Sequence, residues 1–148
     1  MDDADFCCPP TWSSAVRQRG VCCPPTWSMS CPWSQSEKAL ERILTRLIND
    51  ELLDPAQIAV LSTSRDEIEK LRGAEIAGTV LGDELGDRSV LIETVHRFKG
   101  LEADVVILLL HDGEEQDVKR LAYVGMSRAR ALLVLIASKA MFDVIRWA

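Results

Sequence analysis

Short apolar runs that alternate with helix-like segments constrain the fold of this chain more than any other sequence feature. The longest run, Val105–Leu110, has the length of a strand and begins with β-branched residues. Strands are expected over residues 57–62, 76–81, 89–95, 104–110 and 131–137. Strands that are apolar throughout are typical of a parallel sheet covered by helices on both faces. The pattern therefore predicts an α/β fold of three layers.

Segments with helical periodicity lie between these runs. A first helix is expected over residues 35–53, because Ser34 and Glu37 have the spacing of a capping box and apolar residues follow at helical intervals. Further helices are expected over residues 65–72, 114–128 and 139–147. Ligand-binding loops of parallel sheets leave the carboxyl ends of the strands. Such ends are expected at Leu61, Val95, Leu110 and Ile136.

Residues 1–35 do not follow this pattern. The sequence CCPPTWS occurs at Cys7–Ser13 and again at Cys22–Ser28, and paired prolines oppose both helix and sheet. We therefore predict an irregular segment over residues 1–35 and a folded domain over residues 36–148. The segment is interpreted as a local duplication or a misplaced start of the reading frame, with a proline-rich docking segment as the alternative.

The cysteines are confined to that first segment, at Cys7, Cys8, Cys22, Cys23 and Cys31. Their vicinal pairs lack the C-x-x-C spacing of zinc ribbons, so no metal site is predicted, and a zinc-binding head is the weaker alternative. Free thiols are typical of a reducing cytoplasm, which is the expected location. No apolar run approaches the roughly 18 residues of a membrane span, and the acidic start is unlike a secretory signal, so no membrane is expected as a partner.

Charge is distributed unevenly along the chain, whose net charge is −6. Residues 37–93 contain 13 acidic and 7 basic residues, whereas residues 94–148 contain 7 acidic and 8 basic residues. The average disfavours a strongly basic nucleic-acid binder. Contacts with phosphate are therefore expected in the last third of the chain.

A polar loop lies between two of the expected strands, in the sequence Thr94–Glu102. It is expected to bring His96 and Glu102 close together. Gly100 supplies either a positive φ or room for close backbone approach. From the residues alone, a solvated loop is as good an interpretation as a binding loop.

Two arginines mark the junction between a helix and the last strand. The stretch Leu121–Ala129 contains Arg128, and Arg130 follows it. Arginine stays charged and suits bidentate contact with phosphate. For Arg130 the alternative is a cation that compensates the carboxyl end of the helix dipole.

Together these stretches resemble the fifth and sixth motifs of the UvrD/Rep-type superfamily 1 helicases. Thr94-Val95-His96 followed by Lys99-Gly100-Leu101-Glu102 is similar to the fifth motif, and Leu121–Ala129 to the sixth, with Ser127 where the family usually has threonine. The resemblance covers roughly residues 37–148. It implies the second, RecA-like motor domain of a DNA helicase, in a compact form without the inserted subdomain.

The resemblance also implies roles at a nucleotide. Arg128 would be the catalytic arginine finger on the γ-phosphate of ATP bound by a neighbouring motor domain. Gly100, Glu102 and Arg130 would lie at the same ATP, with Glu102 at the ribose. On the nucleic-acid side, the resemblance implies that Thr94 and His96 contact single-stranded DNA.

Two further residues of the motifs are given other roles. Lys99 belongs to the pattern without an assigned partner, and Tyr123 is expected to pack in the core.

The chain has no phosphate loop, because no glycine is followed by lysine anywhere in it. ATP with magnesium is therefore expected to bind only jointly with a missing N-terminal motor domain that carries that loop. The expected function is that of a helicase fragment without autonomous ATPase activity. The alternative is a non-enzymatic interaction module, or a degenerate gene product that keeps the fold.

Overall fold

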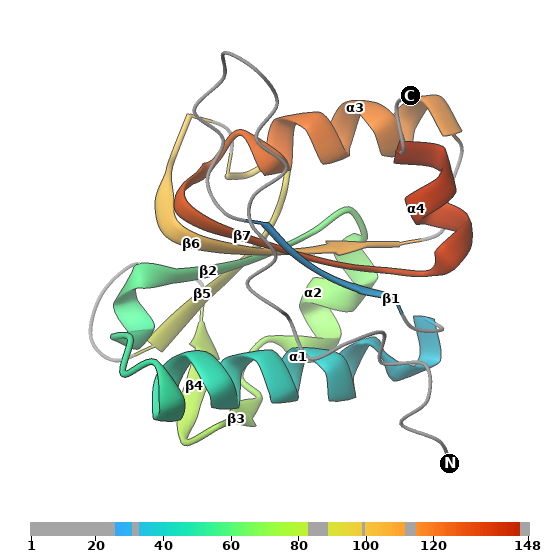
Figure 1. Ribbon diagram of the computed structural model, residues 1–148. Coiled ribbons are helices and arrows are strands. Elements are labelled where there is room, and N and C mark those ends of the chain that lie inside the picture. The colour runs from blue at the N-terminus through green and yellow to red at the C-terminus, as the bar shows by residue number, and fades with distance from the viewer. Residues whose placement is uncertain (1–25, 31–32, 83–88, 99, 112–114, 146–148) are drawn as a thin grey trace.

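A single sheet organises the computed structural model, which describes residues 26–30, 33–82, 89–98, 100–111 and 115–145 (Figure 1). Seven strands lie in the order β1-β7-β6-β2-β5-β4-β3 within these residues. Their bounds are β1 (Thr26–Ser30), β2 (Ile58–Ser62), β3 (Glu75–Ile76), β4 (Thr79–Gly82), β5 (Ser89–Thr94), β6 (Ala103–Leu110) and β7 (Ala129–Ala137). Neighbouring strands are parallel except β3 and β4, which are antiparallel. The predicted α/β class is confirmed.

Helices cover both faces of this sheet. The helices are α1 (Ser36–Thr45), its π-helical continuation η3 (Arg46–Asp50), α2 (Arg65–Leu71), α3 (Glu115–Met126) and α4 (Lys139–Ile145), with short 3-10 turns η2 (Trp33–Gln35) and η4 (Pro55–Gln57). Figure 1 shows α1 and α2 below the sheet and α3 and α4 above it. The three predicted layers are therefore present.

The alternation of side chains along each strand explains why the strands are apolar throughout. In β6, Val105 and Ile107 pack with α1 and α2 in one core, while Val106 and Leu108 pack with α3 in the other. Successive side chains of a strand point to opposite faces, so a strand buried on both faces needs apolar residues at every position.

The first helix begins differently from the sequence-based expectation. The predicted capping box is wrong, because Gln35 occupies the N-cap of α1 and makes no side-chain capping hydrogen bond. Ser34 lies within the 3-10 turn η2, which shifts the start of the helix past it. The amphipathic helix itself is present, and its apolar face supplies Leu40 and Leu44 to the core.

Part of the segment excluded from the predicted domain belongs to the sheet. Strand β1 pairs in parallel with β7, from Thr26 opposite Leu133 to Ser30 opposite Ala137. The paired prolines precede this strand in the sequence, and an edge strand needs only one hydrogen-bonded neighbour, so they do not prevent it. The prediction for residues 1–25 lies outside the described residues.

A hairpin replaces the single short strand expected near residues 76–81. Strands β3 and β4 are joined by Ala77 and Gly78, which both have positive φ. Only β4 continues the parallel part of the sheet, through its pairing with β5.

No helix in the described ranges combines the length and the hydropathy needed to cross a membrane.

Candidate functional site

The connection between β5 and β6 runs across one face of the sheet. Both strands are parallel to β2, so the chain must return from the carboxyl ends of the strands to their amino ends. Thr94 aligns with Ser62, and Ser62 aligns with Leu109 of β6. Leu109 lies six residues after Ala103, so the connection spans about 20 Å at roughly 3.3 Å per residue. We call residues 95–102 the crossing segment.

The crossing segment is anchored in the core and then turns. Phe98 is fully buried, packs in the core under α3, and donates its backbone N–H to the Thr94 carbonyl at 3.1 Å. Gly100 has a φ of +85°, and a Cβ added there would meet nothing within 4 Å. Of the two roles expected for Gly100, the structure therefore supports the positive φ, which L-residues rarely adopt. Lys99 lies outside the described residues.

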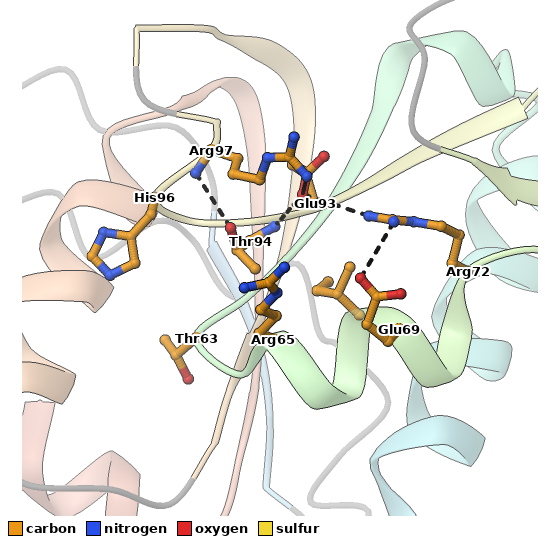
Figure 2. A pocket seen from close by; sticks show the side chains of 9 residues that line it. Thr63, Arg65, Glu69, Arg72, Glu93, Thr94, His96 and Arg97 are labelled. Carbon is orange, nitrogen blue, oxygen red and sulfur yellow. Dashed lines mark hydrogen bonds and ion pairs between the residues drawn. The ribbon is translucent and has the colours of Figure 1, made fainter.

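A cavity of about 400 Å³ opens at the carboxyl ends of β2 and β5 (Figure 2). We call it the carboxyl-edge pocket. Its lining is Thr63, Arg65, Ile68, Glu69, Arg72, Glu93, Thr94, His96 and Arg97. Thr94 is fixed at the strand end, because its Oγ1 accepts a hydrogen bond from the Arg97 backbone N–H at 3.3 Å. His96 is exposed, and its imidazole points away from the other labelled side chains in Figure 2.

The two motifs meet at the opposite edge of the sheet. Arg128 lies in the turn after α3, and its carbonyl accepts a hydrogen bond from the Ala103 N–H at 3.0 Å. Glu102 directly precedes Ala103, Gly100 lies two residues further back, and both are exposed. We call Gly100, Glu102, Arg128 and Arg130 the amino-edge cluster.

The side chain of Arg128 contains a buried polar atom. Its Nε is buried and has no hydrogen-bond partner among the described residues. The Nε of Arg72 is buried and unpaired in the same way, so this atom does not by itself mark Arg128 as a binding residue. The backbone around it is fixed, since the Arg128 N–H donates to the Gly125 carbonyl at 3.1 Å.

Gly125 brings α3 unusually close to the sheet. A Cβ built on this residue would lie 2.9 Å from Cδ1 of Leu108, which is shorter than a van der Waals contact. A larger residue here would force the buried side chain of Leu108 to shift. The contact fixes the end of α3, and with it the turn that holds Arg128.

A bulge directs Arg130 out of the sheet. Ala103 pairs with Ala129, but Val105 pairs with Leu132, so β7 has one extra residue at this point. The Arg130 Nε lies 3.3 Å from Oδ1 of Asp104. Arg130 is the second residue of β7, and its observed ion-pair partner is this carboxylate.

The same carboxylate has a second partner. The other oxygen of Asp104 accepts a hydrogen bond from Nε2 of Gln57 at 3.2 Å. This contact ties the start of β6 to the residue before β2.

The sequence correctly predicted that the candidate residues lie at strand ends. It did not show that they divide between the carboxyl edge and the amino edge of the sheet. Thr94 and His96 lie at the carboxyl edge, as expected from the rule for parallel sheets. Glu102 lies at the amino edge, so the expectation that it is close to His96 is wrong. The reason is the parallel pairing of β5 and β6, which forces the loop to cross the sheet.

Tyr123 also differs from its prediction. Its side chain is 72% exposed, so it does not pack in the core. Ala122 and Val118 are buried on the sheet-facing side of α3, and a neighbouring helical position points about 100° away from them. Leu101, beside the amino-edge cluster, is a second exposed apolar residue.

The motifs alone did not assign the arginines of the carboxyl-edge pocket. Arg65 follows β2 at the start of α2, and Arg97 lies in the crossing segment. The loop after Leu61 was expected to face a ligand, so the strand-end rule contained the signal for Arg65. Arg72 lies in no motif and reaches the pocket only through the direction of α2.

The described part of the chain holds no group of three or more side chains suited to a metal ion. All five cysteines lie outside it, so neither the prediction of no metal site among them nor its alternative, a zinc-binding head, is tested.

Comparison with known proteins agrees with this geometry. Residues 89–136 match the family described as the UvrD-like helicase C-terminal domain, and this range contains both motifs. No curated protein matches the chain in sequence. Among solved structures, the chain is similar to the crystal structure of the C-terminal domain of a possible DNA helicase from Lactobacillus plantarum WCFS1. The TM-score is 0.52 at 22% identity, over 82% of this chain and 80% of that one, which shows a shared fold.

Proposed function

We propose that this chain, which carries a UvrD-like helicase C-terminal domain over residues 89–136, is the second motor domain of an ATP-dependent DNA helicase. It supplies an arginine finger to ATP held by an N-terminal motor domain, and it contributes part of the contact with single-stranded DNA. The hydrogen bond from the Ala103 N–H to the Arg128 carbonyl carries this proposal, because it brings the two motifs together at one edge.

The amino-edge cluster has the chemistry of half a nucleotide site. Arg128 is only partly buried, so the accessible part of its guanidinium could donate to a phosphate oxygen. A fixed guanidinium stabilises the charge that develops during phosphoryl transfer without having to reorganise. Glu102 is exposed beside it for contact with the ribose. Arg130 is a further contact with ATP, held in place by Asp104.

Magnesium and the phosphate loop belong to the other half of this site. The sequence contains no phosphate loop, so we assign that loop, and the magnesium bound with its phosphates, to the partner domain. When bound, MgATP provides the phosphoryl group that is transferred to water. This chain provides the orientation and charge of Arg128.

The crossing segment links the two ends of the proposed mechanism. Thr94, the residue before this segment, and His96 near its start contact the DNA strand, whereas Gly100 and Glu102 near its end contact the nucleotide. Loss of the γ-phosphate would remove contacts of the nucleotide with the Glu102 end of the crossing segment, which Phe98 anchors in the core. The same segment would then shift the residues that hold the strand.

The exposed apolar residues favour a covering partner. Leu101 lies between Gly100 and Glu102 of the amino-edge cluster. The Tyr123 carbonyl accepts a hydrogen bond from the N–H of Ser127, the residue before Arg128. An N-terminal motor domain that places ATP against Arg128 would cover both side chains.

The proposal is tested by measuring ATP hydrolysis with single-stranded DNA present. The chain alone is expected to show no turnover, since it cannot hold the phosphates. Addition of a separately expressed N-terminal motor domain from a compact UvrD-like helicase is expected to restore turnover. Robust ATPase activity of the chain alone contradicts the proposal. Failure of every such domain to gain activity favours a non-enzymatic module that keeps the fold.

A further inference from the structure

One carboxylate lies among the arginines of the carboxyl-edge pocket. Glu93 is the fifth residue of β5, and its side chain is 13% exposed. Its Oε1 is 3.8 Å from Nη2 of Arg72 and 3.9 Å from Nη1 of Arg97. The same oxygen accepts a hydrogen bond from the Thr94 N–H at 3.2 Å. Figure 2 shows Glu93 between the two guanidinium groups.

The three arginines of the pocket are held to different degrees. Arg72 is mostly buried and pairs with both Glu69 and Glu93. Arg97 is 69% exposed, and Glu93 is the ion-pair partner found for it in the described residues. Arg65 is exposed at the start of α2. Arg97 therefore combines two properties. Its guanidinium is open to an incoming anion, and it is already paired with a carboxylate.

A carboxylate and a phosphate are alternative partners for the same guanidinium. Both present oxygen atoms that accept paired N–H bonds from arginine. Glu93 also places a negative charge within the pocket that a phosphate of the strand would enter. Binding of the strand must therefore overcome the pairing of Arg97 with Glu93 as well as the repulsion by Glu93.

We propose that Glu93 is an internal competitor that weakens the grip of this pocket on a nucleic-acid phosphate by holding Arg97. The inference rests on the proposed strand contact by Thr94 and His96 and adds a residue that sets its strength. Weak binding suits a domain that must release and rebind a strand in each cycle. Glu93 is thus a positioning residue that acts through Arg97.

Glu93→Gln tests this role with little change of shape. Glutamine keeps an oxygen acceptor for the Thr94 N–H but removes the charge that holds Arg97. The matched control is Glu69→Gln, which removes the same charge from the same pocket lining. Glu69 pairs with Arg72 at 3.4 Å and is not paired with Arg97.

The measurement is fluorescence anisotropy of a labelled oligo-dT of about 12 nucleotides, within the usual span of single-strand sites. The full chain is used, and salt is varied from about 50 to 200 mM. Freeing Arg97 for one more phosphate should steepen the slope of log affinity against log salt by about 0.7. Glu93→Gln is therefore expected to bind more tightly than wild type at low salt, with that steeper slope. Glu69→Gln is expected to leave the slope unchanged.

The double variant Glu93→Gln/Arg97→Ala separates competition for Arg97 from a general charge effect. The gain of Glu93→Gln is expected to disappear when Arg97 is absent. A gain that survives without Arg97, or an equal gain in Glu69→Gln, overturns the inference.

Two further outcomes separate this inference from the proposed function. If His96→Ala weakens binding while Glu93→Gln changes nothing, the strand contact stands and the role of Glu93 is wrong. If no variant binds the probe, the role of Glu93 and the strand contact both fail, while restoration of ATPase activity still tests the arginine finger.

Discussion

Gly125 shows how one residue links packing to the proposed chemistry. Replacing a glycine inside a helix by alanine ordinarily stabilises a protein by about 0.5–1 kcal/mol. At this position the added Cβ would lie 2.9 Å from a methyl group of Leu108, within the core under α3. Overpacking of this kind typically costs about 1–3 kcal/mol, so it should outweigh the helix propensity.

Gly125→Ala is therefore expected to lower the free energy of unfolding, as measured by urea denaturation. Combining it with Leu108→Ala tests the cause, because removal of the facing methyl groups should make the glycine substitution neutral or stabilising in that background. Stabilisation by Gly125→Ala in the otherwise unchanged chain would show that α3 is not held against β6 in this way.

Single residues also mark the limit of sequence reasoning. The motif spacing identified Gly100 and Arg128, because both stand in patterns of fixed residue type. It did not reveal that Gly100 adopts a positive φ, or that the Nε of Arg128 is buried without an acceptor. Tyr123 was misplaced because the sequence does not show which side of α3 meets the sheet. These properties depend on the directions in which side chains point after packing.

At the scale of elements, the crossing segment is the least common feature of the fold. Parallel strands are usually connected through a helix, and a dozen or more residues are usually needed. Here eight residues make the connection, and burial of Phe98 holds them against the sheet. The strands on both sides were predicted from their apolar runs. The path between them was not, since it depends on which strands pair in parallel.

Phe98→Ala should detach this segment from the core. Loss of a fully buried phenylalanine typically costs about 3–5 kcal/mol. A large fall in the midpoint of thermal or urea unfolding is expected, measured by circular dichroism. Phe98→Leu fills most of the same space and should cost much less. Equal stability of wild type and Phe98→Ala would contradict the anchoring role.

For the whole molecule, the account depends on a sheet that extends beyond the predicted five strands. The five predicted strands correspond to β2, β4, β5, β6 and β7, and the hydrophobic pattern was sufficient to find them. Strand β1 was missed because it follows paired prolines and has few signals of its own. Its pairing with β7 is a long-range contact, which local sequence patterns do not encode.

Removal of residues 1–32 tests the contribution of β1. If β1 covers β7 as described, the shortened chain exposes the backbone of β7, a strongly apolar strand, as the new edge of the sheet. Exposed edges of this kind promote pairing between chains. A lower unfolding temperature and association in analytical ultracentrifugation are expected. A shortened chain that is as stable and as monomeric as the full chain would remove β1 from the folded domain.

The central claim is that Arg128 acts on ATP held by another domain, and its most direct test is the ATPase rate of the reconstituted pair. Arg128→Ala should reduce that rate by about 10³–10⁵, the loss typical of an arginine finger. Arg120→Ala is the control, because Arg120 pairs with Asp117 on the exposed side of α3. This substitution should leave the rate close to wild type, since exposed pairs contribute little. If this chain with Arg128→Ala, combined with the N-terminal motor domain, hydrolyses ATP at the wild-type rate, Arg128 is not an arginine finger.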